Sequence, residues 1–434
     1  MKALMPYLAA GLASPWLSQS REQWADLKQH LLRQPATVEV YLAIDDPYSY
    51  LLAQVLPRLQ ARFAVKWRIY TVLNREAEHY PAPAQWYPNA CHDAEHLARL
   101  YQLSWPQDLP SWSTARRAGY TRDLLLAEQQ ADSVAHVAEL FRRAWQGAAA
   151  TRVWQLADWQ ASLAANEARR KRHKHYASAM LYYAGQWYWG LDRLDHLEHR
   201  LLREGRALCQ TAPQFERTWR DFCTLPAPEQ APEDTELEVF FSIRSPYSHL
   251  GLLRAVQLAE HYHLPLKVRP VLPMLMRGLP VPASKKWYIF HDTKREARKL
   301  GIAYGKVADP LGAGVEACYQ LYAWAEAQGK GLAYLLSVSH GVNSQGLHAD
   351  QPRDLKKMVE RAGLNWAEAQ SLLGNNDWRD WAQDNLNALN DAGLWGVPSF
   401  RYGELRFWGQ DRLGILEQAL RKRWRLASNQ HVTE

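Results

Sequence analysis

Cysteine is scarce in this chain of 434 residues, and its thiols are not arranged for redox chemistry. The four cysteines, Cys91, Cys209, Cys223 and Cys318, include no C-x-x-C pair and no spacing typical of a metal site. Disulfide exchange is effectively excluded, because it needs a pair of redox cysteines. We expect no disulfide framework and no bound metal, and we expect reduced thiols in a cytoplasmic protein.

Long apolar runs are also missing. No stretch reaches the length of a membrane span, so we expect no membrane partner. The first residues, MKALMPYLAAGLASPWL, resemble a secretion signal only faintly, since Pro6 interrupts the apolar run and a single lysine precedes it. The net charge of +7 is spread along the chain rather than gathered in tails, so we expect no nucleic-acid partner.

Aromatic residues, by contrast, are abundant, with 20 tryptophans and 21 tyrosines. Large aromatics bury well, so we expect most of them in cores or groove linings. Apolar residues make up 47% and charged residues 22% of the chain, as in ordinary globular proteins. The length is sufficient for two or three domains.

An internal repeat organises the chain. Residues 38–51, VEVYLAIDDPYSYL, align without gaps on residues 237–250, LEVFFSIRSPYSHL, with seven of the fourteen positions identical. Near the ends of the repeat, YAGQWYWGLDRLDHLE (183–198) matches YGELRFWGQDRLGILE (402–417), and the offset has grown by twenty residues. The sequence therefore predicts one domain present twice, as a tandem duplication with a longer middle in the second copy.

The segments follow from the repeat and from a Pro-rich acidic stretch, LPAPEQAPEDTE, at residues 225–236. We predict a helical N-terminal extension at residues 1–36, a first domain at 37–205, a linker at 206–236, a second domain at 237–424 and a tail at 425–434. Within the extension, the helix is expected around REQWADLKQHLLRQ (21–34).

Both copies follow the same order of elements. In the second copy, a strand at 239–243 leads into a helix from Pro246, and another strand follows at 265–272. A long helical stretch, a strand pair with its turn at Gly403 and a final helix at 410–424 complete the domain. This order predicts an α/β protein with two thioredoxin-like domains, each a mixed sheet with a helical insertion.

The second copy closely resembles the 2-hydroxychromene-2-carboxylate isomerase and kappa-class glutathione transferase family, within the DsbA-like branch of thioredoxin folds. The resemblance covers residues 237–420 and rests on four motifs in order: SPYS after the first strand, PASKKWYIFHDTKREARKLGI (282–302), GLWGVPSF (393–400) and FWGQDRL (407–413). The first copy resembles the family only in its frame.

Ser245 stands where the first strand ends and a helix begins. Ser followed by Pro is a favourable helix start, so capping alone is one interpretation. A helix N-terminus also favours a bound thiolate. The resemblance implies that Ser245 holds the thiolate of glutathione. In the first copy Asp46 takes this position, and Asp caps a helix as well as Ser does, so capping does not explain the choice of Ser.

The resemblance implies further glutathione-binding residues. Pro398 would be cis, with the backbone of Val397 pairing with the cysteinyl backbone of glutathione; a simple turn is the alternative. Gln410 and Asp411 would hold the γ-glutamyl group, although an acidic first turn also suits helix capping. Lys285 and Lys286, of which Lys286 is taken as the binding candidate, would attract an anionic substrate or the glycyl carboxylate, unless KKWY at residues 285–288 is only a solvated helix face.

His249 and Tyr288 are groove candidates that more often serve packing. The first copy has lost three features of the site, since Asp46, Ala179 and Leu191 replace the Ser, the Pro and the Gln. We therefore expect it to be structural. Its basic run RRKRHKH (169–175) is read as an exposed helix end, with an anion or nucleic-acid patch as the alternative.

The leading hypothesis is a glutathione-dependent isomerase or transferase that acts on a small aromatic or unsaturated acid, with its site in residues 237–420. A non-catalytic thioredoxin-like module for a protein partner is the alternative. The sequence leaves open the substrate, the choice between isomerase and transferase, and whether the protein is a homodimer.

Overall fold

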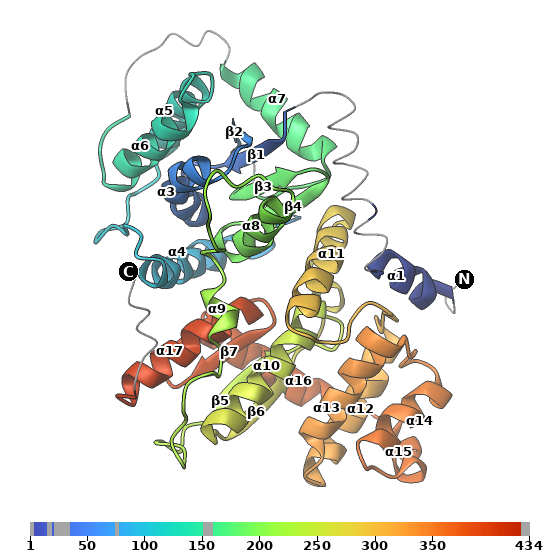
Figure 1. Ribbon diagram of the computed structural model, residues 1–434. Helices are drawn as coiled ribbons and strands as arrows, with labels where there is room; N and C mark the ends of the chain where they lie inside the picture. The colour runs from blue at the N-terminus through green and yellow to red at the C-terminus, as the bar shows by residue number, and fades with distance from the viewer. Residues whose placement is uncertain (1–3, 15–19, 21–34, 74–77, 151–158, 427–434) are drawn as a thin grey trace. The chain divides into compact units, whose positions relative to one another are not determined.

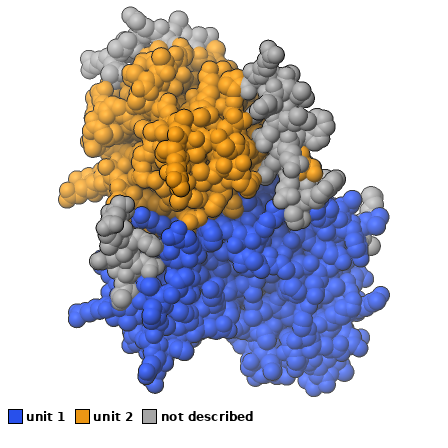
Figure 2. Space-filling view, viewed as in Figure 1, with its two compact units in different colours: residues 1–18, 217–434 blue, residues 19–216 orange. Residues whose placement is uncertain are grey.

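The structure is a computed structural model that describes residues 4–14, 20, 35–73, 78–150 and 159–426 (Figure 1). It contains two compact units, which Figure 2 colours separately. Unit 1 comprises residues 1–18 and 217–434, and unit 2 comprises residues 19–216. The change of unit lies within 206–236, the segment predicted as a linker. The helix predicted at 21–34 lies outside the described residues.

In the part of unit 2 that the structure describes, four strands are interspersed with helices, and a last helix follows them. In chain order they are β1 (Thr37–Leu42), α3 (Pro47–Arg62), β2 (Lys66–Thr71), α4 (Pro83–Leu100), α5 (Thr114–Ala127), α6 (Ser133–Trp145), α7 (Trp159–Arg172), β3 (Met180–Tyr183), β4 (Gln186–Trp189), η2 (Leu191–Arg193) and α8 (Leu194–Arg203).

Unit 1 has the same order with a longer helical insertion. Its elements are α1 (Met5–Ala13), α9 (Arg217–Arg220), β5 (Leu237–Phe241), α10 (Pro246–Tyr262), β6 (Leu266–Pro270), η3 (Met274–Arg277), α11 (Ala283–Lys299), α12 (Ala313–Ala327), α13 (Gly331–His340), η4 (Gly341–Gln345), α14 (Pro352–Arg361), α15 (Trp366–Leu372), α16 (Trp378–Asp391), β7 (Ser399–Tyr402), β8 (Leu405–Trp408), η5 (Gln410–Arg412) and α17 (Leu413–Arg423).

Each unit has a four-stranded mixed sheet of the thioredoxin-like type. The strand orders are β2-β1-β3-β4 and β6-β5-β7-β8, with the first pair parallel and the hairpin antiparallel. Val38 pairs with Trp67 in unit 2, and Leu237 pairs with Leu266 in unit 1. Each residue of the unit 1 pair is 199 positions after its equivalent in unit 2, so the two sheets have the same register. The predicted fold class, two thioredoxin-like domains with helical insertions, is confirmed.

The helical insertion of unit 1 covers the edge strand β6. An edge strand has carbonyl groups with no partner in the sheet. Two buried tyrosines on α12 donate to carbonyls of this segment: Tyr322 to Val268 O within β6 at 3.0 Å, and Tyr319 to Val271 O directly after β6 at 2.7 Å. These hydroxyl groups explain part of the high tyrosine content.

The segments that carry the predicted site meet at one edge of the unit 1 sheet, the edge formed by the carboxyl ends of its parallel strands. Phe241 and Pro270 end the parallel strands side by side. Ser399 begins β7 at the same edge, opposite Trp408 at the end of β8. Ligand sites of open α/β sheets lie at the carboxyl ends of parallel strands. The segments after β5, after β6, before β7 and after β8 therefore meet at this edge.

Helix α10 lies close to the loop before β7. A Cβ atom added to Gly251 would lie 2.9 Å from Cγ of Pro398 and 3.1 Å from the ring of Phe400. At the equivalent positions of unit 2 the large and small side chains are exchanged: Leu52, fully buried, replaces the glycine on the helix, and Ala179 replaces the proline in the loop.

Among the described residues, no helix is long and apolar enough to cross a membrane.

Gly251→Ala should therefore lower the free energy of unfolding of unit 1 by about 1–3 kcal/mol, because the added methyl group overpacks a close contact. Denaturant unfolding of the full chain measures it. Gly11→Ala in α1 is the matched control: nothing lies within 4 Å of its added Cβ, so replacing a helical glycine there should be neutral or stabilising by up to about 1 kcal/mol. Equal effects at both sites would contradict the packing argument.

Candidate functional site

Ser245 caps helix α10 and also faces the loop before β7. Its Oγ accepts a hydrogen bond from the N–H of Ser248 at 3.2 Å and donates one to the carbonyl of Val397 at 3.4 Å. The second bond is long, and the serine is only partly buried. The hydroxyl group is thus held at the helix N-terminus by long hydrogen bonds, so it can form a hydrogen bond to a ligand.

The loop before β7 has the predicted backbone conformation. The Val397–Pro398 peptide bond is cis, so this prediction is confirmed. The N–H of Gly409 donates to the carbonyl of Pro398 at 2.9 Å, which ties the loop to the start of η5. Ser245, Val397 and Pro398 therefore lie together at one place.

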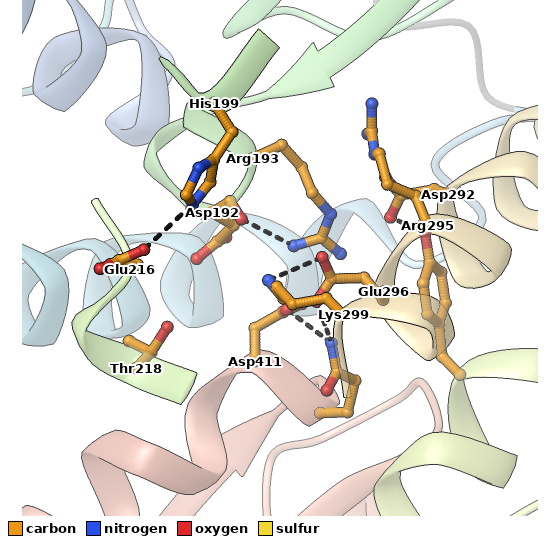
Figure 3. Close-up of polar contacts among 12 residues, drawn as sticks. Asp192, Arg193, His199, Glu216, Thr218, Asp292, Arg295, Glu296, Lys299 and Asp411 are labelled. Atoms are coloured by element: carbon orange, nitrogen blue, oxygen red, sulfur yellow. Dashed lines mark hydrogen bonds and ion pairs between the residues drawn. The ribbon is translucent and has the colours of Figure 1, made fainter. Parts of the chain in front are cut away.

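Gln410 is buried and its side chain is fully used within the fold. Its Oε1 accepts from Arg254 at 2.9 Å, and its Nε2 donates to Glu296 at 3.1 Å and to Asp411 at 2.6 Å. Glu296 also pairs with Lys299 at 2.8 Å (Figure 3). The side chain of Gln410 orients the carboxylate of Asp411, and its backbone N–H at the start of η5 is the group it can offer to a ligand.

Gln410 forms a buried polar triad with Arg254 and Glu296, two residues that the sequence analysis did not name. Arg254 lies on α10, and its guanidinium also donates to the carbonyls of Gln410 and Thr218, at 2.6 and 3.1 Å. Burial lowers the pKa of Arg254, and the carboxylates of Asp411 and Glu296 oppose this shift.

Unit 2 has an apolar version of the same triad. Its equivalent positions hold Val55, Leu97 and Leu191, which are all buried. The fold itself therefore does not require the polar triad. This contrast is the signal in the sequence that could have revealed it.

The basic pair on α11 divides between two surfaces. Lys286 is exposed, whereas Lys285 is partly buried with Nζ 6.0 Å from the ring centre of Trp395. The ring of Trp395 in turn lies 5.2 Å from that of Trp408. Burial lowers the pKa of Lys285 to about 8. Of the two lysines considered from the sequence, Lys285 lies beside the segment that leads into the cis-proline loop, and the role of Lys286 stays a prediction.

His249 is a packing residue. It is buried, with Nδ1 2.9 Å from the hydroxyl of Ser339 and Nε2 3.0 Å from the carbonyl of Ala303. The carbonyl can only accept, so the ring carries its proton on Nε2. Burial lowers its pKa to about 4, so the ring is neutral near pH 7. Tyr288 is half-buried on α11.

In unit 2 the position equivalent to Ser245 is sealed by hydrogen bonds. Asp46 is buried, and its Oδ2 accepts from the hydroxyls of Ser49 at 2.7 Å and Ser178 at 2.8 Å. Its two carboxylate oxygens also accept from the N–H groups of Tyr48 and Ser49. Ser178 is the equivalent of Val397. The carboxylate therefore joins the helix start to the loop and fills the hydrogen-bonding capacity of this position.

The basic run 169–175 is more involved in packing than an exposed helix end. Arg169 and His173 both contact the carboxylate of Glu39, and Arg170 and His175 are buried. The interpretation as a wholly exposed helix end is therefore wrong, because the inward residues of the run hold α7 and the following loop to the sheet. These contacts also remove four of the seven residues from any continuous basic patch.

Residues 236–421 match the DSBA-like thioredoxin domain family. This part of the chain is a DsbA-like thioredoxin domain. A curated relative, 2-hydroxychromene-2-carboxylate isomerase from Pseudomonas putida, is 24% identical over 192 residues, which cover 42% of this chain and 93% of the relative. The DsbA-like domain is thus distantly homologous to that isomerase.

Solved structures with a similar fold include a 2-hydroxychromene-2-carboxylate isomerase, at 23% identity and a TM-score of 0.39, which covers 44% of this chain and 100% of its own. The cytosolic disulfide reductase DsbM from Pseudomonas aeruginosa is also similar, at 18% identity and a TM-score of 0.34, with 44% and 100% covered.

Gln410→Leu should lower the free energy of unfolding of unit 1 by about 2–3 kcal/mol, because Arg254 stays buried without one of its acceptors. The triple variant Arg254→Val, Glu296→Leu, Gln410→Leu copies the apolar set of unit 2 and should recover at least half of that loss. Denaturant unfolding compares the single and triple variants. A triple variant less stable than the single one would show that the polar triad is required by the fold.

The lowered pKa of Lys285 makes stability depend on pH. The folded pKa of about 8 lies below that of an unfolded lysine, near 10.4. Between these values the unfolded chain binds more protons, so stability rises with pH. Relative to Lys285→Met, the wild-type free energy of unfolding should rise by about 2 kcal/mol from pH 8 to 10. Lys286→Met is the control. If the free energy of unfolding of both variants depended on pH in the same way, the lowered pKa would not belong to Lys285.

Proposed function

We propose that unit 1 binds glutathione and acts on an aromatic or unsaturated carboxylic acid, as an isomerase or a glutathione transferase. The observation that carries the proposal is the placement of the Ser245 hydroxyl. It lies at the N-terminus of a helix of seventeen residues, beside the cis-proline loop and one long hydrogen bond from Val397. The residues present fit a thiol tripeptide, as the following contacts explain.

The thiolate position is supplied by Ser245 and α10. A hydroxyl donor and the positive end of a helix both stabilise a sulfur anion relative to the thiol. The donor is now directed at the Val397 carbonyl at 3.4 Å, and it can turn to a sulfur anion without breaking a strong bond. The same carbonyl is then available to a peptide N–H of the ligand, which suits the extended backbone of glutathione.

The far end of the tripeptide would meet η5. Asp411 offers a carboxylate to the γ-glutamyl ammonium, and the N–H of Gln410 offers a donor to the carboxylate of the same group. The polar triad fixes both, since the Gln410 side chain contacts Asp411 at 2.6 Å. Lys285 or Lys286 on α11 would attract the glycyl carboxylate or an anionic substrate.

Bound glutathione would supply a thiolate that adds to the unsaturated carbon of the acid and, in the isomerase, leaves again after rotation about the new single bond. The protein residues hold the thiolate, orient the acid and need no redox change. Catalysis is then mainly thiolate activation and positioning. In a transferase the same residues would act, and the adduct would be the product. We also propose a cytoplasmic location.

Unit 2 is proposed to be a structural relative of unit 1 that arose by duplication. The constant differences in strand register support a common origin. The carboxylate of Asp46, which would repel a thiolate, supports the loss of glutathione binding. A purely non-catalytic role for the whole protein would need Ser245 to act only as a cap.

Ser245→Asp separates the two roles of this residue. An aspartate caps a helix, as Asp46 does, but it would face the Val397 carbonyl where Asp46 has the Ser178 hydroxyl, so the melting temperature should fall slightly, whereas glutathione binding should be lost through repulsion of the thiolate. Ser245→Ala should bind glutathione more weakly and raise the pKa of the bound thiol by about one unit. Calorimetry and thiolate absorbance measure these effects. No binding by the wild type at millimolar glutathione, or unchanged binding by Ser245→Asp, would refute the proposal.

A further inference from the structure

Arg277 ends η3, directly after β6, and no residue of the site described above pairs with it. The parallel strands β5 and β6 end together at Phe241 and Pro270. The segments that follow them, with Ser245 four residues and Arg277 seven residues further along, therefore leave the same edge of the sheet. Arg277 is thus placed at the edge that collects the candidate site.

Two nitrogens of the Arg277 guanidinium are buried without an acceptor, in a side chain that is half-buried as a whole. Its Nε and Nη2 are both buried, and neither has a hydrogen-bond partner among the described residues. Two buried arginines of unit 1 have acceptors for their terminal nitrogens: Nη1 of Arg254 donates to Gln410 and Nη1 of Arg421 donates to the carbonyl of Pro226, although Nε of Arg254 also lacks a partner. A buried charge without a partner is costly, so an unpaired arginine at a site edge is suited to an anion brought by a ligand.

The surroundings of Arg277 agree with this assignment. Burial lowers its pKa, and the neighbouring Tyr319 is the group that opposes the shift. Tyr319 in turn lies beside Ser242 and Ile243, which directly precede the Arg244–Ser245 pair. The arginine is therefore linked through one tyrosine to the end of β5, on the side of the covering helix α12.

Unit 2 shows that the fold does not require a cation here. The offset of 199 residues that relates the strand registers places Glu78 at the position equivalent to Arg277. Glu78 is exposed and has the opposite charge. At this one described position, the unit that keeps Ser245 and the cis-proline has a cation, and the unit that has lost both has a carboxylate.

We infer that Arg277 binds the carboxylate of the acid substrate, as a fork-shaped donor that fixes the acid at the edge of the sheet beside Ser245. Arginine binds carboxylates through two parallel N–H groups, and Nε with Nη2 is a suitable pair. The choice of an unsaturated acid rests on the proposed function; the carboxylate site itself rests on the orphaned guanidinium. Arg277 is a substrate-positioning residue, and glutathione is held without it.

Binding of trans-cinnamate and of its uncharged methyl ester to the glutathione-loaded full chain tests this inference. Arg277→Gln should weaken cinnamate binding at least about tenfold, as expected for a lost charge-assisted hydrogen bond, and leave the methyl ester within about twofold. Arg277→Lys should recover part of the cinnamate affinity. Arg298→Gln, on the exposed side of α11, controls for the loss of one positive charge and should change neither ligand.

Two further measurements separate the possible failures. Glutathione binding to Arg277→Gln should stay within about twofold of the wild type, and its melting temperature should not fall, because an unpaired buried charge has been removed. A variant that loses glutathione, or that unfolds more easily, would place Arg277 in the glutathione site or in the fold, and would overturn the inference. So would a wild type that binds the ester as well as the acid. Cinnamate binding through Arg277 without glutathione binding would refute the proposed function alone.

Discussion

Both units depend on one contact, between the start of the helix after the first strand (α3 or α10) and the loop before the β-hairpin (β3–β4 or β7–β8). In unit 1 it is a single long bond between the Ser245 hydroxyl and the Val397 carbonyl, at 3.4 Å. In unit 2 a buried carboxylate makes the contact, with Ser49 and Ser178 as donors. A buried carboxylate needs several donors, so unit 2 satisfies the contact completely. A hydroxyl needs fewer, so unit 1 retains capacity for a ligand.

The interior next to this contact follows the same division. Unit 1 places Arg254, Glu296 and Gln410 where unit 2 has three apolar side chains. Apolar residues of similar volume are often as stabilising as a buried polar network. The polar version therefore has its value in orientation, since it fixes Asp411 at the start of η5. The arrangement suits a domain in which the helix start contacts a ligand.

The local elements could be predicted from sequence because their signals are local. The Ser245–Pro246 helix start and the turn at Gly403 follow from residues adjacent in the chain, whereas the cis conformation of Pro398 was implied by the family resemblance. The prediction of two mixed sheets, each with a helical insertion, followed from the internal repeat together with the order of elements. These parts of the fold needed no knowledge of distant contacts.

The partners of the site residues could not be predicted in this way. Arg254 and Glu296 lie in helices far apart in sequence, and their burial is a tertiary property. Lys285 and Lys286 are one residue apart, yet one residue turns a helix by about 100°, so only the packing of α11 decides which lysine lies near Trp395. The orphaned nitrogens of Arg277 likewise appear only when its surroundings are known.

The side-chain sizes at Gly251 and Pro398 of unit 1, and at Leu52 and Ala179 of unit 2, affect whether unit 2 could recover the site by mutation. A side chain on the helix and a proline in the loop exclude each other, because an added Cβ would approach Pro398 to 2.9 Å. Unit 2 has taken the other choice, with Leu52 buried on the helix and Ala179 in the loop. Restoring the proline alone would meet the leucine, and removing the leucine alone would leave a cavity. Either substitution alone would therefore lower the stability of unit 2. For this reason packing preserves the pair Leu52 and Ala179, in which the site is lost.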